Sequence, residues 1–132
     1  MPRYATVLAG DPAATYRQVD LASRTGGADP HALVDLLYGE AIRALSGAAW
    51  AIEHQDFRIK SDRVTRATAI LFALENGLDF ERGGDVSHTL AKLYRGLRAH
   101  VVEASIGNDP APFRNAAAQL KEIADAWASV RH

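Results

Sequence analysis

The side chains that could support metal binding or catalysis are five histidines and a few neighbouring carboxylates. The histidines are spread along the whole sequence, at His31, His54, His88, His100 and His132. A di-metal centre in a helical bundle needs Glu-x-x-His from each of two helices, together with further inward carboxylates. The nearest match is one Asp-x-x-His, from Asp85 to His88, at an expected helix start. We therefore predict no metal site and interpret the histidines as solvated or capping residues.

The acidic residues Asp79, Glu81 and Asp85 lie close together in the sequence, but they flank an expected turn, where water can solvate them. No partner that would line a pocket can be identified for a catalytic carboxylate pair. The chain also lacks cysteine, a G-x-S-x-G motif and a P-loop. We therefore predict that the protein is not an enzyme and uses no cofactor.

One alternative with chemistry remains, which is a four-helix histidine phosphotransfer domain that uses His88. The segment from His88 to Lys92 is similar to the His-x-x-Lys-Gly pattern of those domains. The lysine comes one place late and no glycine follows it, so room around a phosphorylated imidazole is not provided.

Composition limits the remaining classes. The 132 residues suffice for one domain, and 15 basic against 16 acidic residues show no excess that would indicate nucleic-acid binding. No apolar run approaches the roughly 20 residues that span a membrane, and no apolar core of a signal peptide is expected at the N-terminus. A cytoplasmic protein fits these features.

Apolar residues recur in steps of three and four along four segments, and no segment alternates with period two. The pattern predicts an all-α, antiparallel up-down-up-down four-helix bundle over residues 29–132, preceded by an extended or partly helical arm over residues 1–28. The expected core positions are Leu33, Leu37, Ala41, Ala44, Leu45, Ala48 and Ile52; Val64, Ala67, Leu71, Leu74 and Leu78; Val86, Leu90, Leu93, Leu97, Val101 and Ala104; and Phe113, Ala117, Leu120, Ala124 and Trp127.

Asp29–Pro30 is typical of a helix start, and Asn108–Asp109–Pro110 repeats that pattern before the fourth helix. The doublet Gly83–Gly84 predicts the tight turn between the second and third helices, with Asp85 capping the third and Phe80 packed under the turn. Several apolar residues fall off or at the edge of the core stripes: Leu36, Ile42, Trp50, Ile70, Phe72, Tyr94, Val102 and Ile106. This surplus indicates a surface that a partner helix could cover.

The turn region carries a family resemblance. Leu78–Val86 reads LDFERGGDV and is followed by Leu90 and Leu93–Tyr94, which resembles the LDFEKGGEIAxNLxxLY signature of the flagellar secretion chaperone (FliS) family. Further landmarks in the same order are residues 28–30, 36–42, 51–53, 103–106 and 126–127. Gly39–Glu40 replaces the family's Asp–Gly, and the first fifteen residues lie outside the resemblance.

The resemblance implies a cytoplasmic chaperone that holds the disordered C-terminal segment of flagellin in outer hydrophobic grooves. It also implies that the chaperone prevents premature polymerisation, aids delivery to the export gate, and can take the anti-sigma factor as a second client. On this basis we expect the flagellin-binding groove to include Ile70, Phe72, Leu74, Leu78, Phe80, Tyr94 and Val102. Tyr16 and Val19 match the family's arm, which can cover the empty groove. A homo-oligomer that buries the same apolar surface is the remaining alternative.

Overall fold

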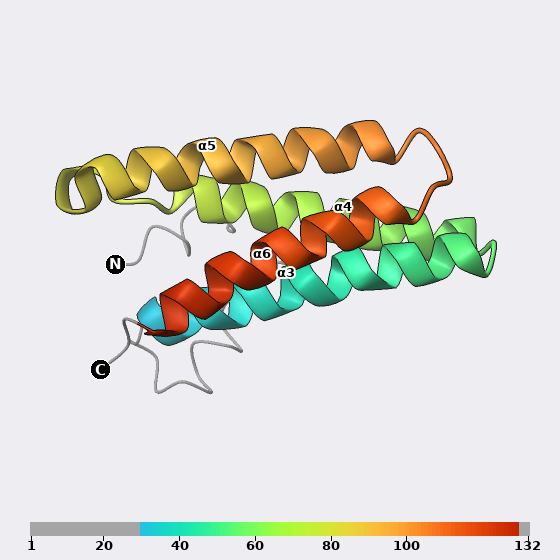
Figure 1. Cartoon of the computed structure of the whole chain (residues 1–132), viewed down its shortest axis with the longest axis horizontal. Coiled ribbons are helices and arrows are strands. Elements are labelled where there is room, and N and C mark those ends of the chain that lie inside the picture. The colour runs from blue at the N-terminus through green and yellow to red at the C-terminus, as the bar shows by residue number, and fades with distance from the viewer. Residues whose placement is uncertain (1–29, 130–132) are drawn as a thin grey trace.

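Four helices dominate the part of the chain that the computed structural model describes, residues 30–129. They are α3 (Pro30–Glu53), α4 (Phe57–Asn76), α5 (Phe80–Ala104) and α6 (Ala111–Ser129), and no strand occurs within this range. Short connections make consecutive helices antiparallel (Figure 1). The predicted all-α, up-down-up-down four-helix bundle is therefore confirmed. The arm predicted over residues 1–28, with Tyr16 and Val19, and the Asp29 cap lie outside the described residues.

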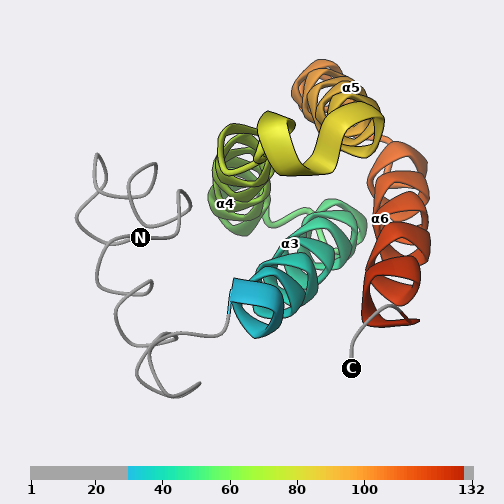
Figure 2. The same cartoon turned by 90° about the vertical axis from the view of Figure 1, so that its left-hand side faces the viewer.

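The four helices surround one core in the order α3, α4, α5, α6, so that each helix packs on two neighbours (Figure 2). The pair α3–α4 is packed most extensively and the pair α5–α6 least. Small residues explain the close packing of α3, because Ala41, Ala44, Ala48 and Ala51 are all fully buried along its length. The predicted core stripe of the first helix is confirmed throughout.

The core face of α5 differs from the prediction. Val86 is 66% exposed and Leu93 43% exposed, whereas Ser87, Ala91 and Tyr94 point inward. The buried face is centred on Tyr94 because its hydroxyl forms a hydrogen bond with the hydroxyl of Tyr38 on α3. Burial raises the pKa of Tyr38 above its usual value, with Asp35 adding to the effect and the Tyr94 hydrogen bond opposing it. The predicted stripe is therefore wrong at Val86 and Leu93 and confirmed at Leu97 and Val101, while Leu90 and Ala104 are partly buried against the core.

A buried lysine closes the end of the bundle where α5 turns into α6. The Lys60 ammonium on α4 donates to the carbonyl oxygens of Ser105 (2.9 Å) and Gly107 (2.7 Å) and to Oδ1 of Asn108 (3.0 Å). The last carbonyls of a helix lack partners within it and carry partial negative charge. Lys60 therefore satisfies and neutralises the C-terminal end of α5, and α6 then starts with Asp109 accepting from the Ala111 amide (2.9 Å).

The first and last helices are joined by His31 and Trp127. Their rings stack with centroids 4.2 Å apart, and the indole N–H of Trp127 donates to the carbonyl oxygen of His31 (3.1 Å). Nε2 of His31 in turn lies 3.2 Å from the carbonyl oxygen of Trp127. This reciprocal pair, the His31–Trp127 clip, holds the end of α6 against the start of α3.

None of the four helices between residues 30 and 129 is both long and apolar enough to cross a membrane.

Candidate functional site

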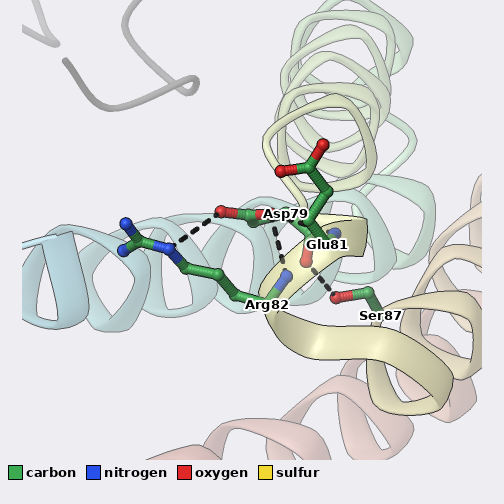
Figure 3. Close-up of polar contacts among 4 residues, drawn as sticks. All are labelled: Asp79, Glu81, Arg82 and Ser87. Carbon is green, nitrogen blue, oxygen red and sulfur yellow. Dashed lines mark hydrogen bonds and ion pairs between the residues drawn. The ribbon is translucent and has the colours of Figure 1, made fainter.

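The turn between α4 and α5 lies earlier in the chain than the sequence suggested. Helix α4 ends at Asn76, and the Gly77 amide donates to the carbonyl oxygen of Ala73 (2.9 Å). Asp79 then caps α5, since its Oδ1 accepts from the amides of Glu81 and Arg82 at 3.1 Å each (Figure 3). The predictions that α4 runs to the glycine doublet and that Asp85 caps α5 are wrong. The chain reverses at residues 77–79 because Asp79 provides the cap one turn before the doublet.

The glycine doublet instead bends α5. Residues after Asp79 form one helical turn, and Gly84 then adopts φ 52° and ψ −125°, a conformation that favours glycine. Gly83 is required for a different reason, because a Cβ there would lie 1.9 Å from Oγ of Ser87. That hydroxyl donates to the carbonyl oxygen of Asp79 (2.9 Å), which fastens the bent turn to the rest of α5 (Figure 3).

Replacing Gly83 with alanine is therefore expected to lower the free energy of unfolding by about 1–2 kcal/mol, through crowding and loss of the Ser87 hydrogen bond. Urea denaturation followed by circular dichroism measures this. The control is Gly96→Ala on the same helix, where a Cβ would meet nothing within 4 Å. It is expected to stabilise by about 0.5–1 kcal/mol, as alanine does in a helix interior. Equal effects of the two substitutions would contradict the proposed role of Gly83.

The bent turn places Phe80 beside the straight part of α5 rather than under the turn. Its ring contacts the ring of His88, with centroids 4.8 Å apart, and remains partly exposed. Phe80 and His88, with Ala91, Lys92 and Arg95, line a shallow hollow of about 320 Å³. An aromatic ring is thus presented to solvent at one end of the α4–α5 pair.

The same side of the bundle carries two further apolar side chains. Phe72 on α4 is 49% exposed, and the guanidinium of Arg98 on α5 lies 5.0 Å from its ring centroid. Val102, one helical turn beyond Arg98, is half exposed. Between Phe72 and the hollow, the Glu75 carboxylate pairs with Arg95 (3.0 Å) and Arg98 (3.2 Å). We call this surface the α4–α5 face; its exposed apolar residues are Phe72, Phe80 and Val102.

The other four residues expected in the groove are buried. Ile70, Leu74, Leu78 and Tyr94 all belong to the hydrophobic core. Ile70 and Tyr94 lie at the edges of their predicted stripes. In the bundle, α4 and α5 are each oriented so that this edge faces the core. These four side chains therefore support the α4–α5 face from beneath and are not accessible on it.

Sequence reasoning missed a second exposed strip on α5. Val86 and Leu93, with half-buried Leu90, lie on the side of α5 opposite Arg95 and Arg98, and thus toward α6. They are separated by four and three residues, which is the spacing of a core stripe, so the sequence pattern predicts that they are buried. Serine and alanine at positions 87 and 91, one place further along, are the signal that could have revealed the true inward face.

Titratable groups do not converge on a reactive centre. Among residues 30–129, no group of three or more histidine or carboxylate side chains is placed to hold a metal ion. His54 stacks on Trp50 and His31 on Trp127, so each ring is engaged in packing.

Comparison with known proteins agrees with this description. The family model described as flagellar protein FliS matches residues 12–132. Flagellar secretion chaperone FliSB of Pseudomonas aeruginosa is 32% identical over 117 residues, which is 89% of this chain and 93% of the relative. Flagellar secretion chaperone FliS of Salmonella typhimurium is 31% identical over 116 residues (87% and 86%), and that of Vibrio cholerae 30% over 112 residues (85% and 82%). The chain therefore belongs to the FliS family of flagellar secretion chaperones.

Proposed function

We propose that this protein is a cytoplasmic export chaperone that binds the disordered C-terminal segment of flagellin on the α4–α5 face. Binding would prevent premature polymerisation and keep the segment deliverable to the flagellar export gate. The observation that carries the proposal is the row of exposed apolar side chains, Phe72, Phe80 and Val102, on a bundle whose core is otherwise closed. The names of the relatives support the chaperone role, and the family resemblance supplies the cargo.

The physics of such binding needs no catalytic group. An amphipathic segment lays its apolar face on a groove between helices, with anchors at helical spacing. Ordering a disordered segment costs about 2–5 kcal/mol, and the interface must bury at least about 1,000 Å² to offset it. The three exposed apolar residues are too few for that area, so the segment would extend beyond them. The strip of Val86, Leu90 and Leu93 offers a second contact on the other side of α5.

The seven residues expected in the groove form two groups, three that are exposed and four that are buried. The three exposed members would contact the cargo, and the four buried members would form the packed layer that holds the α4–α5 face in shape. Tyr16 and Val19, in the arm, would cover the empty face and leave when cargo arrives. The anti-sigma factor would be a second client of the same face.

Titration with the C-terminal segment of the host flagellin tests the proposal. We expect calorimetry to detect binding and circular dichroism to show more helix than the sum of the two separate spectra. No heat and a purely additive spectrum would overturn it. Sedimentation of the protein alone addresses the homo-oligomer alternative, since a monomer leaves the apolar face available for cargo.

The position of His88 does not favour the phosphotransfer alternative. That chemistry needs an exposed histidine in the middle of a helix. His88 is exposed, but it lies only four residues beyond the Gly84 bend, and its ring packs against Phe80.

A further inference from the structure

The hollow beside Phe80 combines an apolar floor with two cationic side chains and a histidine. Phe80 and Ala91 provide apolar surface, and His88, Lys92 and Arg95 line the same hollow. The three polar residues follow each other at spacings of four and three along α5, so they lie along one side of the helix. The hollow therefore has Lys92 and Arg95 next to each other along one side, with His88 one turn before them.

The charges of this row are not balanced within the described residues. Arg95 shares the Glu75 carboxylate with Arg98, so two guanidinium groups face one carboxylate. The ammonium of Lys92 forms no ion pair or hydrogen bond to any residue between 30 and 129, and it is exposed. The hollow therefore presents positive charge next to an aromatic ring, which attracts an anionic group attached to an apolar segment.

We propose that this hollow is a specificity subsite for an acidic side chain of the cargo, located one helical turn from an apolar side chain. The apolar side chain would rest on Phe80 and Ala91, while the carboxylate would pair with Lys92 and Arg95. Two cations spaced along α5 suit a helix that lies alongside it, whereas the terminal carboxylate of a chain would need a closed set of donors. The proposal rests on the proposed function, because it names the feature of the cargo that this face reads.

The test measures binding of the 132-residue protein to the C-terminal flagellin segment by calorimetry. Lys92→Glu is expected to raise the Kd about 10-fold at 0.15 M salt, and Lys92→Gln about 3-fold. The 10-fold effect should fall below about 3-fold at 0.5 M salt, because partly exposed ion pairs are screened. The matched control is Arg58→Glu, the same charge reversal at an exposed position in the first turn of α4, away from the hollow. It should change the Kd by less than about 2-fold.

A charge exchange identifies the partner group. Each acidic residue of the flagellin segment is replaced by lysine in turn and titrated against the Lys92→Glu variant. We expect one replacement to restore binding to within about 3-fold of the unmodified pair. If instead no replacement restores binding, or if amidation of the segment's C-terminus removes the dependence on Lys92, the proposed side-chain subsite is wrong.

These outcomes distinguish a failure of the subsite proposal from a failure of the proposed function. Failure of the wild-type protein to bind any part of the segment would reject the proposed function, and the subsite with it. Binding that is equally tight in the wild type, Lys92→Glu and Arg58→Glu proteins would reject the subsite alone.

Discussion

Lys60→Met is expected to lower the free energy of unfolding by about 2–3 kcal/mol. Methionine keeps most of the buried stem but removes the ammonium that bonds Ser105, Gly107 and Asn108. The carbonyl oxygens at the end of α5 then lose both their donor and the positive charge that opposes the helix dipole. Urea denaturation followed by circular dichroism measures the change.

The control for this substitution is Lys92→Met, which removes an identical ammonium from an exposed position on α5. Surface substitutions of this kind change stability by less than about 0.5 kcal/mol. If both variants stay within that range, Lys60 does not stabilise the α5–α6 connection. A change in the denaturant slope as well as the midpoint would indicate that this end of the bundle opens separately.

Phe72→Asp is expected to weaken binding of the flagellin segment about 100-fold while the bundle stays folded. Phe72 is half exposed, with the guanidinium of Arg98 5.0 Å from its ring centroid, and a cargo side chain would bury it completely. An aspartate carboxylate at this position would have to lose its hydration when the interface forms, and burying that charge without a partner costs free energy. Calorimetry with the segment gives the affinity, and thermal denaturation monitors the fold.

Phe57→Asp is the matched control, because Phe57 is 51% exposed on the same helix but at its opposite end. Aspartate is also favourable there, in the first turn of α4. Equal loss of affinity in both variants would show that the cargo is not localised on the α4–α5 face. Unfolding of the Phe72 variant alone would show that this residue belongs to the core.

The fold was predictable because periodicity and capping agree along most of the chain. The steps of three and four in α3 and α4 identify residues that are buried, except Val64, which is partly buried, and Pro30 begins the first helix as expected. The prediction for the glycine doublet was wrong because two adjacent glycines indicate an interruption of a helix, but not whether the helix ends or bends there. Only the Asp79 cap and the Ser87 hydroxyl show that the doublet bends a helix instead of ending one.

The candidate site was predictable only in part. Phe72 and Val102 lie clearly off their stripes and are exposed, whereas Ile70 and Tyr94 lie at stripe edges and are buried. A helical wheel cannot resolve such edges, since a rotation of a few tens of degrees decides burial. In α5 this rotation follows from the hydroxyl pair between Tyr38 and Tyr94, a contact between residues 56 positions apart. The local pattern contains no information about that contact.

The His31–Trp127 clip has a consequence for synthesis of the protein. Translation produces α3 before the other three helices, and one of its two packing partners, α6, is the last of the four to be made. Until Trp127 emerges from the exit tunnel, the side of α3 that α6 covers lacks its helical partner among residues 30–129. The bundle can therefore close only after Trp127 has been made, 96 positions after His31.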